Sequence, residues 1–592
     1  MSNIDDLFKG AGLSGNKRKN EAIRDPNEIY KSARTGNATP RHAQVEDETA
    51  DDDREAGPSA TAAADDADFG PALPDADEDD NEGRFFGGGI SKDEAEILDY
   101  VQADDAPEET IDEPWLRRRI LALEKHINKN AELRAKFEDE PQKFIASEAD
   151  LDASIKALSI LAEYPVLFPE LARMGSVESL VGLLAHENTD IAIDVLQLFA
   201  ELTDDDVDSS EDQWDALVTP MLAADLLGLL ESNLVRFNEA DEADASGVYH
   251  GLSILENICS TRKPIAEKVA SHTRLAKYLL SRASRTESPV SQNKQYSTEI
   301  LAILAQSTPA ARVALADLDA VDTALQLAAA YRYGDPPKGG AEEEYMQNVF
   351  EVLVCLSDCV SGKYKFVEAE GVELCVLLVT DGKKAAKTAA LRLLDHASDS
   401  SASEGTGVAA AAAEVCIRVV DAAGLKPLFA TFFKTKDRDA MDHLLGLFAS
   451  MMQLLPLEEA PRIRLLAKWV EKDYQKLSKL VGLREQLARG LAAVGKKYGA
   501  KDGKLPADAD EDDADAFLSE QLSAGLFTVR NIDLILAWLA VEDRGVRKRV
   551  EEQVGLDKVI STLKDLLEGV DGSKEGDEDT KGMLTTLIGF LE

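Results

Sequence analysis

The sequence is poor in the residues from which most enzyme and metal sites are built. It has 7 histidines and 5 cysteines among 592 residues, and it contains no Walker-type phosphate loop, HExxH motif or paired-cysteine metal motif. His186 and His396 lie near acids, but neither is accompanied by a serine or cysteine in a nucleophile context. We therefore expect a protein that is not an enzyme and that has no cofactor and no metal site.

Disulfide spacing and long apolar runs are also lacking. The five cysteines are odd in number and show no framework spacing, which favours a reducing compartment. The N-terminus has no apolar run of the signal-peptide type, and the most apolar later stretch, GVAAAAAEVCIRVV, is interrupted by Glu414 and Arg418. These absences predict a soluble, intracellular protein.

Positive charge is scarce. The chain has 65 Lys and Arg against 111 Asp and Glu, a formal net charge of -46. Such a charge repels nucleic-acid phosphates and anionic membrane surfaces. We expect basic protein partners, no membrane binding and no direct contact with nucleic acid.

The first part of the chain combines low hydrophobicity with many acids. Residues 1–80 are predicted to be a disordered acidic tail, because they cannot bury enough apolar surface to offset chain entropy. Within them, Lys17, Arg18 and Lys19 form a candidate nuclear localisation signal; the alternative is a few solvated charges. Residues 81–113 hold Phe85 and Phe86 before a short amphipathic helix, which indicates a docking segment or, alternatively, an arm packed on the first long helix.

Aromatic residues make up only 6% of the chain, and Leu and Ala supply most of the apolar surface, which favours helices. From residue 114 onward apolar residues recur at spacings of three and four, and no convincing strand pattern occurs. We predict an all-α fold. Residues 114–165, with Trp115 and Leu116 near their start, are expected to form an N-terminal helical cap; the alternative is pairing with a second chain as a homodimer.

Short Leu-rich helices recur at a regular interval. Their anchors are separated by 46, 52, 46, 51 and 53 residues, and they are Val177, Ala223, Leu275, Val321, Val372 and Leu425. A longer apolar helix follows each of the first five anchors after a polar loop, and this period is typical of armadillo and HEAT solenoids. We predict armadillo-type repeats over 166–450 in a right-handed superhelical solenoid, followed by a C-terminal helical region at 451–592.

Polar residues recur near the end of each longer helix. In an armadillo array this position faces the concave groove, where amides and carboxylates can hold an extended basic peptide. Solvated helix ends are the alternative. The predicted groove residues are Glu201, Asp204, Asn257, Gln306, Asp358, Asp395 and His396.

The segment FEDEPQKFIASEADLDASIKALSILAEYPVLFPELARMGSVESLVGLLAHENTDIAIDVLQLFAELTDDD resembles the armadillo region of the beta-catenin-like protein 1 family. The segments ASGVYHGLSILENI, KQYSTEILAILAQ, KFVEAEGVELCVLLV, ALRLLDHA and FLSEQLSAGLFTVRNIDLILAWL resemble the same family in the same order. The resemblance covers about residues 82–592.

The resemblance implies a nuclear scaffold of the spliceosome. It implies association with the Prp-nineteen-type complex and recognition of basic, localisation-type segments of splicing factors such as the cell-division-cycle-five-like protein. The alternative is a nuclear import adaptor, which carries a repeated Trp four residues before each groove Asn. Here Gln197, Ser253 and Ala302 stand at those positions, so the adaptor is disfavoured.

Overall fold

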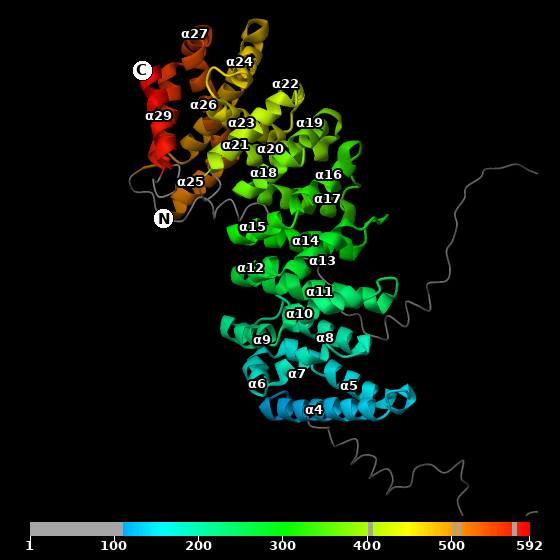
Figure 1. The fold of residues 1–592 in the computed structure, drawn as a ribbon. Coiled ribbons are helices and arrows are strands. Elements are labelled where there is room, and N and C mark those ends of the chain that lie inside the picture. The colour runs from blue at the N-terminus through cyan, green and yellow to red at the C-terminus, as the bar shows by residue number, and fades with distance from the viewer. Residues whose placement is uncertain (1–109, 401–406, 501–504, 507–510, 571–576) are drawn as a thin grey trace, which may run out of the picture. The chain divides into compact units, whose positions relative to one another are not determined.

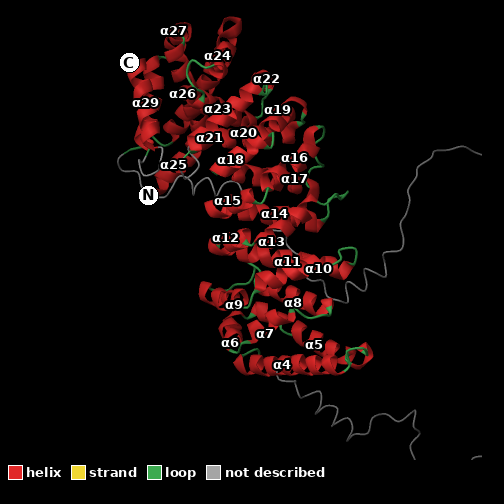
Figure 2. Ribbon diagram, viewed as in Figure 1, coloured by secondary structure: helices red, strands yellow, loops and turns green. Residues whose placement is uncertain are grey.

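The computed structural model describes residues 110–400, 407–500, 505–506, 511–570 and 577–592 (Figure 1). The predicted acidic tail lies outside the described residues. So do the basic cluster of Lys17, Arg18 and Lys19 and the aromatic pair Phe85 and Phe86. Every regular element in the described ranges is a helix, and none of their residues is in a strand (Figure 2). The all-α prediction is confirmed.

Helix α4 (Glu113–Lys136) begins the folded chain. The Asp112 side chain accepts a hydrogen bond of 2.9 Å from the backbone N–H of Trp115, and Pro114 lies in the first turn, where its missing N–H is not needed. Trp115 and Leu116 are buried, and α4 packs on α5 (Ile145–Lys156). Both side chains are therefore used within the chain's own core, as the expected N-terminal helical cap requires.

Six units of three helices follow, after the short turns η1 (Pro141–Lys143), η2 (Ser159–Glu163) and η3 (Pro165–Leu167). In each unit the third helix is the longest. The units are α6 (Phe168–Arg173), α7 (Ser176–Leu183) and α8 (Thr189–Leu202); α9 (Glu211–Ala223), α10 (Leu226–Arg236) and α11 (Glu242–Thr261); α12 (Lys263–Ser271), α13 (Thr273–Ser284) and α14 (Gln292–Ser307); α15 (Pro309–Asp317), α16 (Ala320–Ala328), the turn η4 (Ala329–Arg332) and α17 (Ala341–Ser357); α18 (Val360–Glu368), α19 (Gly371–Asp381) and α20 (Lys384–Ser398); and α21 (Val408–Asp421), α22 (Leu425–Lys434) and α23 (Arg438–Leu454). The armadillo-type repeat is confirmed.

A residue in the left-handed conformation lies between the first and second helices of five of these units. The five residues are Gly175, Asp225, Asp319, Glu370 and Ala423, with φ between 58° and 73°. Two positions after each comes a buried apolar residue, and these are Val177, Leu227, Val321, Val372 and Leu425. We call each left-handed residue a repeat junction, because it sets which residue of the second helix enters the core.

In the second unit, the predicted anchor residue is wrong. We expected Ala223 as its anchor, but Ala223 is exposed at the end of α9, and Leu227 takes the anchor position. The apolar run MLAADLLGLL spans both helices, and the repeat junction at Asp225 turns α10 by 67° relative to α9. A continuous apolar run hides such a turn, because periodicity alone does not reveal a change of direction.

The third helices of the units stack on one another. Each of α5, α8, α11, α14, α17, α20 and α23 contacts the next (Figure 1). Helix α8 begins where the Asn188 side chain accepts a 3.0 Å hydrogen bond from the Asp190 N–H, and nine of its 14 residues are buried. A helix with a neighbour on each side needs a wide apolar surface, which explains its narrow polar stripe.

The stack continues beyond residue 450. The later helices are α24 (Ala460–Lys497), α25 (Glu511–Ala524), α26 (Leu526–Glu542), α27 (Arg544–Gln553), α28 (Leu556–Gly569) and α29 (Asp577–Leu591). Helix α26 packs on α23, and α29 packs on α26. A buried ion pair connects three helices of this region. Arg484 of α24 donates to Asp533 of α26 at 2.8 Å, and the Thr562 hydroxyl of α28 donates to the same carboxylate at 2.8 Å.

No single helix in the described part of the chain has both the length and the hydropathy that a bilayer span requires. The bent pairs α9–α10 and α25–α26 meet these requirements only when the two helices of each pair are taken together.

Candidate functional site

The side of the stack formed by the long helices carries polar contacts between neighbouring repeats. We call this side, made by α5, α8, α11, α14, α17, α20, α23 and α26, the long-helix face. We call each polar contact that joins two successive long helices a polar rung. At least one polar rung lies between every successive pair in this series.

The first rungs join α5, α8 and α11. The Lys156 ammonium of α5 lies 3.2 Å from the Asp194 carboxylate of α8. The Asn257 amide of α11 donates to the Ala200 carbonyl at 3.2 Å and to the Thr203 hydroxyl, just after α8, at 3.1 Å. Asn257 is buried, so these bonds satisfy a polar group that is withdrawn from water.

The middle rungs join α11, α14, α17 and α20. The Tyr296 hydroxyl of α14 donates to Glu256 of α11. The Gln306 amide of α14 donates to Glu351 of α17 at 3.2 Å, and Arg392 of α20 approaches the same carboxylate at 2.7 Å. Glu351 therefore receives contacts from both neighbouring long helices.

The last rungs join α17, α20, α23 and α26. The Nδ1 atom of His396 on α20 lies 3.6 Å from Asp358, at the end of α17. The Nδ1 atom of His443 on α23 lies 2.9 Å from Asp395 of α20. The Thr528 hydroxyl of α26 donates to Asp442 of α23 at 2.7 Å.

Gly446 makes room for the Asp395 rung. A Cβ atom at this position of α23 would lie 2.2 Å from the Asp395 Oδ1 atom, well inside the distance that two atoms can occupy. The close approach of α23 to the Asp395 carboxylate thus requires a residue without a side chain. The His443–Asp395 contact depends on that approach.

Burial and neighbouring charges shift the pKa of several rung groups. Burial opposes the charged form of His396, but the Asp358 and Asp395 carboxylates outweigh it, so the pKa of His396 lies above its ordinary value. Burial raises the pKa of Asp395, and His443 partly opposes that rise. Burial, with a hydrogen bond to Asp152, raises the pKa of Asp194 to about 7.

The structure places the predicted groove residues at the ends of the long helices, or just after them, as their spacing indicated. Five of them contact another long-helix segment through polar rungs, namely Asn257, Gln306, Asp358, Asp395 and His396. Glu201 instead accepts a 2.9 Å hydrogen bond from Gln197 of its own helix, and Asp204 accepts one of 2.9 Å from the Asp206 N–H of its own loop. Glu201 and Asp204 are both half-buried.

Several rung residues were not found from the sequence. They are Lys156, Asp194, Thr203, Glu256, Tyr296, Glu351, Arg392, Asp442, His443 and Thr528, and the space at Gly446 was missed as well. Some of them lie one or two helical turns before the polar residue predicted near the end of the same long helix. The others lie elsewhere on the long helices that form the rungs, or directly after one. The usable signal was a polar residue one or two helical turns before the predicted one, as at Arg392, Glu351 and Asp194.

The long-helix face is rich in acids. Each long helix from α8 to α23 carries at least one half-buried acid, as in Glu201, Glu256, Glu299, Glu351, Asp395 and Asp442. The half-buried Lys and Arg residues on the same six helices are Lys387 and Arg392. No group of three or more His, Cys, Asp or Glu side chains in the described part of the chain is arranged to hold a metal ion. The long-helix face therefore carries more half-buried carboxylates than half-buried Lys and Arg side chains.

Comparison with known proteins gave a family match, several relatives and a set of solved structures. The family described as "Catenin-beta-like, Arm-motif containing nuclear" matches residues 95–568. The chain is 35% identical to the beta-catenin-like protein 1 homolog of Schizosaccharomyces pombe over 532 residues, which cover 87% of this chain and 91% of that protein. It is 33% identical to beta-catenin-like protein 1 of Homo sapiens over 440 residues, covering 72% and 76% of the two chains. A designed armadillo repeat protein is 14% identical over 53% of this chain and 98% of its own, with a TM-score of 0.30.

Proposed function

Because this chain belongs to the catenin-beta-like family of armadillo-motif nuclear proteins, we propose that it is a nuclear scaffold for splicing factors. It would hold basic, extended segments of those factors along the long-helix face. The armadillo fold and the family support the scaffold role. The family resemblance supports the proposed place in the spliceosome, within a Prp-nineteen-type complex.

The excess of half-buried acids on the long-helix face carries this proposal. A Lys or Arg side chain that reaches a half-buried carboxylate forms a charge-assisted hydrogen bond, typically worth about 1.5–3 kcal/mol. Successive helices pack 8–10 Å apart and an extended peptide advances about 3.3 Å per residue, so roughly three peptide residues would span each repeat. Basic side chains at that spacing would pass successive long helices in step with the repeats.

Glu201 and Asp204 are the strongest candidates for contact with the ligand. Their hydrogen bonds come from their own helix and loop, whereas the five other predicted residues join one repeat to the next. A carboxylate that accepts one hydrogen bond retains acceptor capacity for a guanidinium or ammonium group. The rungs would serve as the rigid support on which these acids are held.

The residues of the long-helix face continue to disfavour the import-adaptor alternative. Ser253 and Gln197 are half-buried on α11 and α8, and none of the six long helices from α8 to α23 contains a Trp. A ladder of Trp side chains between which a cargo signal lies is thus missing from this face.

A titration of basic peptide tests the proposal. A fluorescent Lys/Arg-rich localisation-type peptide is titrated with the full chain and with a Glu201→Lys, Asp204→Lys variant, at low and at high salt. We expect a large loss of affinity in the variant and weaker binding of the unaltered chain at high salt. The control is Glu163→Lys, Glu178→Lys, which changes the net charge equally at two exposed positions. Equal losses in variant and control, or an affinity independent of salt, would contradict the proposal.

A further inference from the structure

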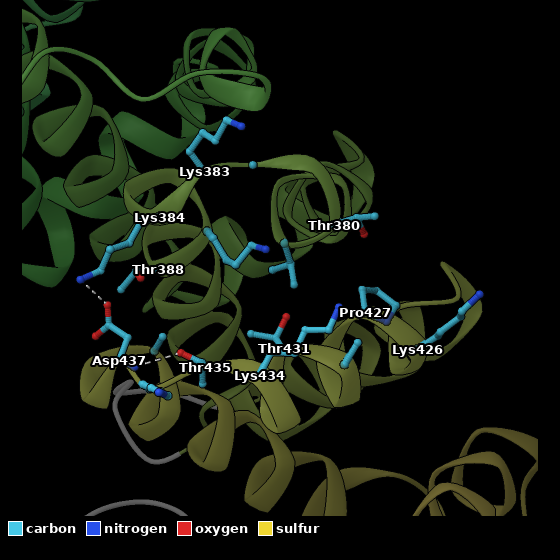
Figure 3. A pocket seen from close by; sticks show the side chains of 16 residues that line it. Thr380, Lys383, Lys384, Thr388, Lys426, Pro427, Thr431, Lys434, Thr435 and Asp437 are labelled. Carbon is cyan, nitrogen blue, oxygen red and sulfur yellow. Dashed lines mark hydrogen bonds and ion pairs between the residues drawn. The ribbon is translucent and has the colours of Figure 1, made fainter.

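A pocket of about 840 Å³ lies between two neighbouring repeats, at the end of α20 opposite to His396 (Figure 3). Its wall comes from the end of α19, the start of α20, helix α22 and the loop that leads into α23. Its volume is in the range of sites that bind small ligands or a few side chains. The pocket therefore is large enough to receive part of a peptide.

The lining of this pocket reverses the charge of the rest of the chain. It contains six lysines and one aspartate; the lysines are Lys383, Lys384, Lys387, Lys426, Lys434 and Lys436. This amounts to a formal charge of +5 in a chain whose net charge is -46. We call this site the lysine pocket. Lysines gathered against the prevailing charge repel one another, so an anion that enters between them is stabilised.

Among the residues that the structure describes, an ion pair neutralises one of these lysines. Lys384 lies 2.9 Å from Asp437, and this contact raises the pKa of Lys384 (Figure 3). Within the described ranges, no ion pair is formed by the other five lysines. Four of those five are exposed and Lys387 is half-buried, so their ammonium groups can reach a ligand.

The spread of the lysines indicates what kind of anion fits. Lys426 and Lys434 lie eight residues apart on α22, which places them about 12 Å apart along the helix axis. A single phosphate group is too small to bridge them. The lining also contains the apolar side chains of Pro427 and Ala430, which lie between these two lysines in the sequence, and of Val379. The pocket is thus suited to several separate negative charges with an apolar group among them.

We propose that the lysine pocket binds an acidic segment of a partner protein, with several Asp or Glu carboxylates spaced along an extended peptide. A long nucleic acid fits less well, because beyond this pocket it would run over a strongly acidic chain. A short acidic peptide needs only the local charge. Four threonines of the lining, Thr380, Thr388, Thr431 and Thr435, add hydroxyl groups next to the ammonium groups.

This site is separate from the basic-peptide site proposed for the long-helix face. The lysines lie at the start of α20 and along α22, whereas Asp395 and His396 lie near the end of α20. The two sites have opposite charge preferences. One chain would thereby hold a basic segment and an acidic segment at the same time, and the two activities can be tested independently.

The test measures fluorescence anisotropy of a labelled Asp/Glu-rich peptide with a central Leu, titrated with the full chain. The variant is Lys383→Glu, Lys434→Glu, and the matched control is Lys277→Glu, Lys558→Glu, which makes the same charge change at exposed lysines outside the pocket. We expect the pocket variant to raise the dissociation constant about tenfold or more and the control to change it about twofold or less. The same peptide with Asn and Gln in place of its acids should not bind.

Three results would overturn the proposal. The first is no binding of the acidic peptide by the unaltered chain. The second is equal loss in the pocket variant and the control, which would indicate non-specific attraction. The third is tighter binding of a singly phosphorylated, otherwise neutral peptide, which would indicate a phosphate site instead.

Two further measurements keep the result unambiguous. If the charge-reversed variant fails to fold, the milder Lys426→Gln, Lys436→Gln variant replaces it, since both residues are exposed and make no ion pair within the described residues. Binding of the Lys/Arg-rich peptide is measured on the same proteins. It should be retained in the pocket variants, so failure of one proposal is distinguishable from failure of the other.

Discussion

The two ends of α20 use charge in opposite ways. Near its C-terminal end, Asp395 and His396 contact the neighbouring long helices through His443 and Asp358. At its N-terminal end, Lys383 and Lys387 form no ion pair within the described residues. Charges that join repeats have an oppositely charged neighbour on the next helix, whereas charges without a partner among the described residues are available to a ligand. The first kind should determine stability and the second kind binding.

The largest expected effect on stability comes from adding a side chain at Gly446, which lies against Asp395 near the C-terminal end of α20. In Gly446→Ala, the new methyl group displaces the Asp395 carboxylate and breaks its contact with His443. We expect a destabilisation of about 1–3 kcal/mol from this overpacking. The measurement is thermal and urea denaturation followed by circular dichroism.

Gly482→Ala is the matched control for this substitution. Gly482 is exposed in α24, and an added Cβ there meets no atom within 4 Å. Because Ala is a better helix former, this variant should be more stable by about 0.5–1 kcal/mol. If Gly446→Ala also raises the free energy of unfolding, the close packing of α23 on Asp395 is not needed for the fold.

A smaller effect on stability is expected at the first rung, the contact between Lys156 and Asp194. Here the free energy of unfolding should depend on pH. The pKa of Asp194 is raised to about 7, so the folded chain keeps this proton at pH values where the unfolded chain has released it. Stability should therefore fall as pH rises from about 4 to about 7. Asp194→Asn mimics the protonated form. At pH 8 its free energy of unfolding should exceed that of the unaltered chain by about 1 kcal/mol.

The advantage of Asp194→Asn should shrink as the pH is lowered to 5. The measurement is the denaturation midpoint at a series of pH values. Asp208→Asn, at an exposed loop position, serves as the control and should leave the pH profile unchanged. A profile of the Asp194 variant parallel to that of the unaltered chain would show that this carboxyl does not carry the pH dependence.

The smallest effect on stability is expected at the N-terminal end of α20. In Lys383→Gln, Lys434→Gln, two exposed side chains without ion pairs in the described residues lose their charge. Stability should stay within about 0.5 kcal/mol of the unaltered chain. A clear loss of stability would mean that the lysine pocket belongs to the fold in the same way as the rungs do.

The fold was largely predictable from the sequence because armadillo repeats impose a period on the apolar residues. Val177, Val321, Val372 and Leu425 were identified as anchors and are buried. The failure at Ala223 has a local cause, since the apolar run continues across the repeat junction at Asp225.

The candidate site was predictable only in part. The helix ends of Asn257 and His396 were identified correctly, but spacing does not reveal that Asn257 bonds to the preceding repeat or that Gly446 leaves space for Asp395. Those facts depend on which side chains face each other across two helices. The lysine pocket was missed because its residues come from two segments, GKKAAKT and KPLFATFFKTKD, that are locally basic and far apart in the sequence.

The repeat junctions also bear on how proteins of this type change length during evolution. Gly175 and Asp225 are 50 residues apart, Asp319 and Glu370 are 51 apart, and Glu370 and Ala423 are 53 apart, yet the same anchor geometry follows each one. An insertion in a loop between helices costs little, because closure entropy grows slowly with loop length. One inserted between a junction and its anchor would rotate the buried position by about 100° around the helix. Insertions and deletions should therefore accumulate in the loops and be excluded from the two residues after each junction.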